Sequence, residues 1–260
     1  MVFDPAPAAA ALRQARLDRV AVSPLPAGIA PTTDAEGAAV QLALARMADA
    51  VPPFGFKIGA TGRRMQAYLG VDAPIAGFMA GKDVYLAHAD LRFADSFRPG
   101  VECEVAVRLA RDLAPGPCSL QQALAAVGDF VAGIEVVENR YGDLKQLGTP
   151  TLVADQMYHS AVVIGEPARV DWRTLDIGAL RGTISLDDGT RDEGVTTDLL
   201  GHPLNGLAWL AGSAVATAFG GLRAGQVIML GSVTPPIWLT GPATVTVAFE
   251  PLPPVTLRLR

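Results

Sequence analysis

The chain of 260 residues is 50% hydrophobic and only 18% charged, which excludes a disordered protein and supplies enough apolar surface for a core. Lys and Arg number 21 against 26 Asp and Glu, and the densest basic cluster is Arg63-Arg64, so we expect no nucleic-acid partner. The two cysteines, Cys103 and Cys118, are too few for a disulfide framework.

The first fifty residues are predicted to be helical. Apolar residues at helical spacing indicate one helix over 6–21, and Thr33-Asp34 begins a second helix that ends near residue 50. The start of the chain has no basic segment followed by a long apolar stretch, so we expect a cytoplasmic protein. We assign residues 1–53 to an N-terminal helical layer and 54–260 to a β-rich core, in one structural unit.

Most of the remaining chain is predicted to form strands. Residues 54–59 are strand-like, and 62–69 form a short helix that ends at Gly70. Alternating polarity predicts further strands over 101–109, 130–138, 158–165 and 179–186, an Asp-Gly hairpin over 186–194, and three strands after residue 224. Because strands outnumber helices and strand–helix–strand alternation is poor, we expect an α+β fold with a coiled, largely antiparallel β core.

Residues 203–222 form an uncharged stretch that a hydropathy window would mark as a membrane span. Asn205, Ser213 and Thr217 interrupt the stretch, and basic flanks and aromatic anchors are almost absent. We therefore expect a buried core helix here and no association with a membrane.

Three glutamates are candidate metal ligands. Glu102 and Glu104 lie two residues apart in a predicted strand, so their side chains point to the same face. Like charges there repel unless a cation lies between them, and carboxylate oxygens suit a hard divalent cation. The alternative is an exposed strand face, with Cys103 pointing into the core. Glu135 lies among apolar residues of the next strand and is a candidate third ligand, and both interpretations stay open on these residues alone.

Lys57 is the candidate proton carrier, because it lies between Phe56 and Ile58 in a strand-like segment. A lysine without solvation has a lowered pKa and can exchange protons. The alternative is a lysine that reaches solvent from a strand edge. The three histidines form no paired motif, and we expect them to have structural roles. The chain has no nucleophile elbow and no glycine-rich phosphate loop.

An ordered set of motifs from residue 54 onward resembles the fumarylacetoacetate hydrolase superfamily. The similarity is greatest to its branch of 2-keto-4-pentenoate hydratases and 4-oxalocrotonate decarboxylases. The motifs are FKIGATGRRMQAYLGVDAPIAG over 56–77, the E-x-E strand of Glu102 and Glu104, Ile134-Glu135, Asp155 to Gly165, Ala208 to Ala211, and Leu222 to Ser232.

This resemblance implies a fumarylacetoacetate hydrolase-type β core in which residues 54–260 carry the catalysis. It implies a divalent metal, Mg²⁺ or Mn²⁺, held by Glu102, Glu104 and Glu135. The substrate would be a 2-oxo acid, with Lys57 as the catalytic residue. Asp155 and Ser232 would bind the substrate. A homo-oligomer is expected. A complex with a related pathway enzyme is a further option.

The resemblance leaves the reaction open among three alternatives. The first is a hydratase that adds water to a 2-hydroxy-2,4-dienoate (2-oxopent-4-enoate type) and yields a 4-hydroxy-2-oxo acid. The second is a decarboxylase of a 2-oxo-3-enedioate (4-oxalocrotonate type), and acylpyruvate-type hydrolysis ranks after it. Apart from these three reactions, the alternative from another class is a non-catalytic ligand-binding or partner subunit.

Two positions bear on the choice of reaction and substrate. Hydratases of this branch carry an acid where this chain has Ile75, and Asp72 would replace it only if the turn shifted. The decarboxylase branch more often has isoleucine at this place. A second carboxylate on the substrate would need a cation, for which Arg63, Arg64 and Arg140 are the candidates.

Overall fold

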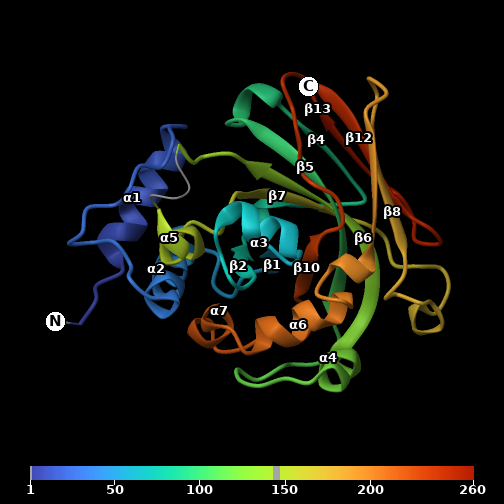
Figure 1. The fold of residues 1–260 in the computed structure, drawn as a ribbon, viewed down its shortest axis with the longest axis horizontal. Helices are drawn as coiled ribbons and strands as arrows, with labels where there is room; N and C mark the ends of the chain where they lie inside the picture. The colour runs from blue at the N-terminus through green and yellow to red at the C-terminus, as the bar shows by residue number, and fades with distance from the viewer. Residues whose placement is uncertain (1, 143–146) are drawn as a thin grey trace.

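Two curled β-sheets form the centre of the computed structural model, which describes residues 2–142 and 147–260 (Figure 1). The larger sheet has eight strands in the order β2-β1-β10-β5-β6-β7-β3, with β11 paired to β5. The smaller sheet has five strands in the order β4-β13-β12-β8-β9. Among the described strands, only β1–β10, β13–β4 and β3–β7 pair in parallel, which confirms the largely antiparallel β core.

The larger sheet consists of β1 (Gly55–Gly59), β2 (Ile75–Met79), β3 (Val84–Leu86), β5 (Pro99–Leu109), β6 (Val127–Glu138), β7 (His159–Ile164), β10 (Val227–Ser232) and β11 (Ile237–Trp238). The smaller sheet consists of β4 (His88–Leu91), β8 (Arg181–Leu186), β9 (Arg191–Val195), β12 (Ala243–Phe249) and β13 (Val255–Leu259). The α-helices are α1 (Ala6–Leu17), α2 (Asp34–Met47), α3 (Arg63–Leu69), α4 (Leu120–Ala126), α5 (Gly148–Ala154), α6 (Pro203–Ala211) and α7 (Ala214–Ala218). Short 3-10 turns lie at Gly81–Asp83, Phe93–Asp95, Trp172–Thr174 and Thr196–Asp198.

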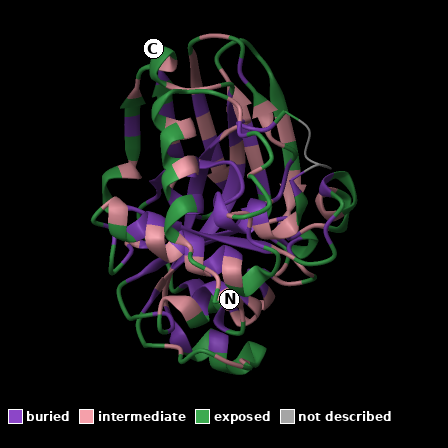
Figure 2. Cartoon of the chain, turned by 90° about the vertical axis from the view of Figure 1, so that its left-hand side faces the viewer, coloured by how far each residue is buried: buried purple, intermediate pink, exposed green. Residues whose placement is uncertain are grey.

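The predicted strands and the Asp-Gly hairpin are confirmed, and of the two interpretations left open for β5 the exposed strand face is wrong. Both faces of β5 are buried, as the purple centre of Figure 2 shows for the sheet as a whole. The face that carries Glu104 also carries Ala106, which packs in a second apolar cluster with Met79, Val131 and Met229. The curl of the sheet therefore encloses a face whose alternating polar residues suggested exposure to solvent.

The N-terminal helices pack beside the larger sheet. Helix α2 contacts α1, α5, α7 and β2, and the side chain of Thr33 accepts a hydrogen bond from Glu36 N at its start, as predicted. Helix α1 ends at Leu17, earlier than expected, because the chain turns at Arg19 with a φ of 53°. Val22 N then donates to Arg140 O, so the segment after α1 is fixed against the core.

One buried glutamine joins the helical layer to the sheet. Gln41 on α2 is fully buried, and its Nε2 donates to Ala76 O at 2.7 Å and to Val153 O at 2.5 Å. Its Oε1 accepts from Phe78 N at 3.2 Å. A single side chain on α2 thus satisfies backbone groups on both β2 and α5.

The uncharged stretch over 203–222 is buried as expected but forms two helices instead of one. Helix α6 ends at Ala211, before Gly212, and Ser213 caps α7 by accepting a hydrogen bond from Ala216 N at 3.1 Å. Helix α6 packs against α4 and β10, and α7 packs against α2. Among the described helices, none is long and apolar enough to cross a membrane.

Replacing Gln41 by Met should destabilise the protein. Methionine fits the volume but leaves two buried carbonyls and one N–H without this partner, at about 1–3 kcal/mol for each unpaired group. We expect urea unfolding to show a loss of at least about 2 kcal/mol. Gln121→Met is the matched control, since Gln121 is exposed on α4. Equal urea midpoints for the two variants would contradict a stabilising role for the Gln41 hydrogen bonds.

Candidate metal and substrate site

The β-ladder brings the three predicted glutamates together. Glu102 on β5 lies directly opposite Glu135 on β6, and Glu104 lies two residues further along β5, opposite Ser232 on β10. One potential ligand atom from each glutamate lies within 4.8 Å of the others. Glu104 and Glu135 are buried, whereas Glu102 is half-buried at a cavity. The side chains therefore form one cluster that reaches the surface of the cavity.

The three carboxyl groups of this cluster have too little positive charge around them for all three to ionise. Burial raises the pKa of Glu102 to about 8, and the charge of Glu135 adds to this effect. Burial also raises the pKa of Glu104 well above its usual range, with further contributions from Glu135 and Glu102. Burial alone would raise the pKa of Glu135 too, but the charge of Lys57 and the hydrogen bond from His159 lower it.

These residues fit a divalent metal ion. Three carboxyl groups share one buried ammonium, and Glu135 Oε2 is buried without a hydrogen-bond partner. Buried like charges ionise together only when a cation balances them, and carboxylate oxygens are the ligands that Mg²⁺ and Mn²⁺ prefer. The donor set is therefore that of a hard divalent cation.

Lys57 is buried in the site and does not reach solvent from a strand edge. Only 1% of the residue is exposed, and its Nζ lies 3.3 Å from Glu135 Oε1. The Nζ also donates a hydrogen bond to Met157 O at 2.6 Å. Because Lys57 lines the cavity while its ammonium is held from two sides, the proton-bearing atom has a fixed place beside the glutamates.

His159 was predicted to be structural, but its side chain contacts the glutamate cluster. Its Nδ1 lies 2.9 Å from Glu135 Oε1, at the start of β7. Burial lowers the pKa of His159, and the contact with Glu135 reverses this only in part, so the ring is neutral with its proton on Nδ1. A lone histidine at the start of a strand gives no local signal for this role.

A cavity of about 1230 Å³ lies in front of the glutamate cluster. Tyr68, Tyr158 and Trp238 form part of its wall, and three acids, the half-buried Asp192 and the exposed Glu193 and Asp198, come from β9 and the turn after it. Arg63 and Arg64 at the start of α3 also line the cavity, whereas Arg140 does not. Of the three arginines considered for a second substrate carboxylate, the structure therefore places two within reach.

Ser232 lies at the cavity, next to a backbone group that contacts Glu104. A bulge in β10 lets Gly231 N donate to Glu104 Oε2 at 3.0 Å. Gly231 has a φ of 111°, and a Cβ at this position would lie 2.2 Å from Thr61 Oγ1, so only glycine fits. The Ser232 hydroxyl donates to Thr234 O at 2.8 Å and accepts from Cys103 N at 3.1 Å. Its contact with a substrate stays a prediction.

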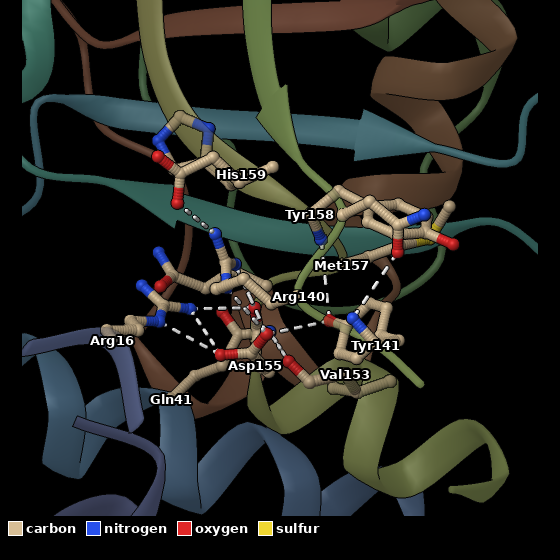
Figure 3. A network of polar contacts seen from close by, with 12 residues as sticks. Arg16, Gln41, Arg140, Tyr141, Val153, Asp155, Met157, Tyr158 and His159 are labelled. Atoms are coloured by element: carbon tan, nitrogen blue, oxygen red, sulfur yellow. Dashed lines mark hydrogen bonds and ion pairs between the residues drawn. The ribbon is translucent and has the colours of Figure 1, made fainter. Parts of the chain in front are cut away.

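Asp155 lies apart from the cavity, in contrast with its predicted contact with substrate. Its carboxylate is fully buried and pairs with Arg16 and Arg140, while Tyr141 Oη donates to Oδ2 at 2.7 Å (Figure 3). Burial alone would raise the pKa of Asp155, but the two guanidinium groups and the hydrogen bonds lower it. The carboxylate is thus ionised and already paired within the protein.

Neither Ile75 nor Asp72 lies at the cavity. Ile75 is buried at the start of β2, opposite Gly59. Asp72 is exposed, and neither residue lines the cavity. Asp72 therefore does not replace the missing acid.

Comparison with known proteins places this site in a family. The model of the fumarylacetoacetate (FAA) hydrolase C-terminal domain matches residues 58–260. A 2-keto-4-pentenoate hydratase from Paraburkholderia phymatum is 32% identical over 247 residues, which are 94% of this chain and 93% of that protein. A 4-oxalocrotonate decarboxylase from Pseudomonas putida is 30% identical over 78% of this chain and 76% of its own length.

A solved structure supports the same relationship. The 4-oxalocrotonate decarboxylase from Pseudomonas putida G7, complexed with calcium and acetate, superposes with a TM-score of 0.87 at 25% identity. The alignment covers 98% of this chain and 97% of that one. The hydratases and decarboxylases among these relatives are all lyases. Because the family model spans most of the chain and the hydratase aligns over nearly its whole length, this chain belongs to the fumarylacetoacetate hydrolase family.

Proposed function

We propose that the protein is a metal-dependent hydratase that converts a 2-hydroxy-2,4-dienoate into a 4-hydroxy-2-oxo acid. The observation that carries this proposal is the cluster of Glu102, Glu104 and Glu135 around the Lys57 ammonium, at the wall of a cavity. The similarity to 2-keto-4-pentenoate hydratase over nearly the whole chain supports this reaction.

The three glutamates would hold Mg²⁺ or Mn²⁺. When bound, such an ion polarises a 2-oxo group and stabilises negative charge on its oxygen. Glu102 is the ligand nearest to solvent and faces the cavity, whereas Glu104 is fixed from behind by Gly231 N. The protein thus fixes one ligand firmly and leaves the side toward the substrate open.

Lys57 would hold a proton beside the oxygens of the substrate. Its ammonium is oriented by Met157 O and Glu135, so its third hydrogen is free to point into the cavity. Tyr158 and Trp238 cover part of the wall with aromatic rings 5.9 Å apart and limit the access of water. A substrate with a second carboxylate would meet Arg63 or Arg64.

Decarboxylation of a 2-oxo-3-enedioate is the second candidate. Ile75 is apolar and fully buried where a hydratase carries its acid, and loss of CO₂ needs an electron sink but no added water. The decarboxylase fold superposes over almost the whole chain. A non-catalytic partner subunit is disfavoured because Lys57 and all three glutamates are in place.

The two reactions separate in one experiment. Metal-stripped protein is mixed with 2-hydroxypenta-2,4-dienoate, with and without Mg²⁺ or Mn²⁺, and the ultraviolet absorbance of the dienol is followed. Metal-dependent loss of absorbance, with 4-hydroxy-2-oxopentanoate as product, supports the hydratase. Release of CO₂ from 2-oxohex-3-enedioate instead supports the decarboxylase. Absence of turnover with both substrates would contradict the lyase proposal.

We also propose that residues 1–53 and 54–260 form one structural unit, which is supported by the packing of α2 against α5, α7 and β2. A homo-oligomer, a complex with a related pathway enzyme, and a cytoplasmic location stay predictions from the sequence. Light scattering on the purified protein measures its oligomeric state.

Replacing Glu104 by Gln should abolish metal-dependent turnover. The variant keeps the size of the side chain but removes one anionic ligand, so we expect a loss of at least about 100-fold in kcat/KM. Glu166→Gln is the matched control, because Glu166 is exposed. Mn²⁺ binding, followed by calorimetry, should weaken in the first variant only. Full activity of Glu104→Gln would rule out a role as ligand.

The metal-free protein should lose stability as the pH rises from about 6.5 to 8. The pKa of Glu102 in the folded chain is about 8, above its usual value, so over this range the unfolded chain has already released a proton that the folded chain retains. His159, whose pKa is lowered in the folded chain, opposes this decline in part near pH 6.5, where an unfolded histidine is about half protonated, and is neutral in both states above about pH 7.5. Mn²⁺ replaces the proton, so the rise in Tm that Mn²⁺ causes should grow with pH.

Melting curves in chelator and in Mn²⁺ test this pH dependence. Glu102→Gln should flatten the decline of Tm with pH in chelator. An unchanged slope in this variant would show that another group causes the decline.

A further inference from the structure

We propose that Arg16 on α1 is a positioning residue for Lys57 and acts through Asp155 and the backbone that follows it. The proposal rests on the proposed function, in which Lys57 holds a proton at the substrate. Arg16 lies outside residues 58–260, which match the family model, so this chain supplies it from its N-terminal helices. Figure 3 shows the residues that connect Arg16 to the site.

The first step is the contact between Arg16 and Asp155. Arg16 Nε donates to Asp155 Oδ1 at 2.9 Å, and Arg16 Nη2 donates to the backbone carbonyl of Asp155 at 2.7 Å. One guanidinium therefore fixes both the side chain and the peptide of Asp155. Arg140 and Tyr141 donate to the other carboxylate oxygen, Oδ2, and Arg140 Nη2 also donates to the carbonyl of Asp155, at 3.4 Å against 2.7 Å for Arg16.

The second step is the strained backbone after Asp155. Gln156, Met157 and Tyr158 have φ angles of 56°, 39° and 64°, a left-handed conformation that non-glycine residues adopt rarely and here adopt three times in succession. Such a segment persists only where its surroundings hold it. Gln156 Nε2 donates to Phe78 O, and Tyr158 N donates to Tyr141 Oη at 3.4 Å.

The third step is the orientation of the Met157 carbonyl. This carbonyl is in the strained segment and accepts the 2.6 Å hydrogen bond from Lys57 Nζ. If Asp155 loses its fixed orientation, the segment can relax toward an extended conformation and its carbonyl turns away from Lys57. Arg140 and Tyr141 still pair with the buried carboxylate after Arg16 is removed, so the variant is expected to fold.

The position of Arg16 allows chemical rescue. Its side chain is 28% exposed and lines a second cavity of about 320 Å³, together with Arg13 and Lys82. Truncation to alanine leaves a space next to Asp155 that a guanidinium ion can enter from solution. Arg13 is exposed, lines the same cavity and makes no hydrogen bond to Asp155 among the described contacts, so Arg13→Ala is the matched control.

The first measurement uses the metal-loaded enzyme and its substrate. Arg16→Ala should lower kcat by about 10- to 100-fold through misplacement of Lys57, with KM and Mn²⁺ affinity nearly unchanged. Millimolar guanidinium should restore much of the loss, whereas urea should not. Arg13→Ala should match the native enzyme with and without guanidinium.

The second measurement does not depend on activity. The sequence contains three lysines, Lys57, Lys82 and Lys145, so ¹⁵N-lysine labelling yields few side-chain signals. The Lys57 ammonium signal, assigned with Lys57→Arg, should exchange slowly in the native protein, broaden or shift in Arg16→Ala, and return with guanidinium. If native enzyme turns over neither substrate, the proposed function fails, yet this signal still tests the role of Arg16.

Two results would overturn the proposal. One is an unchanged Lys57 signal together with unchanged kcat in Arg16→Ala. The other is a loss of kcat that follows the loss of Tm, without a change in the Lys57 signal and without rescue by guanidinium. The latter would assign Arg16 to stability alone.

Discussion

The proximity of three buried carboxyl groups to one buried ammonium is the constraint on which the rest of the structure depends. Glu102, Glu104 and Glu135 share the charge of Lys57, and burial makes this imbalance costly. Such a cluster needs a rigid support, and its carboxyl groups can all ionise only when a cation balances them. The long ladder of β5 and β6, buried on both faces, is that support, and the need for a cation is what links the fold to metal-dependent chemistry.

Residues of the N-terminal helical layer fix the backbone on which the same site is built. Gln41 satisfies backbone groups on β2 and α5, and Arg16 pairs with Asp155 at the end of α5. The segment after Asp155 then carries two groups to the cluster: the Met157 carbonyl reaches Lys57, and His159 reaches Glu135. Each of the three left-handed residues in this segment costs on the order of 1–3 kcal/mol, so their surroundings must hold them.

The sequence predicts the β-rich architecture and the cluster of three glutamates better than it predicts the surroundings of that cluster. Alternation identified β5 and β6, and the spacing of Glu102 and Glu104 put both on one face. The same alternation suggested an exposed face, because burial of both faces depends on the curl of the sheet. Short strands such as β3 and β11 have too few residues to show a period. The contact between Arg16 and Asp155 joins residues 139 positions apart, and no local pattern signals it.

The pairing register of β5 and β6 limits where the chain can change in length without separating the three glutamates. Glu102 faces Glu135 only because both strands keep their length and alignment, and one inserted residue in either would send the two side chains to opposite faces of the sheet. An insertion or deletion in the ladder would thus separate the carboxyl groups, whereas a change of length in the turn between β8 and β9 would leave this register in place. The wall of the cavity can therefore change outside the ladder while the distances between the three carboxyl groups stay the same.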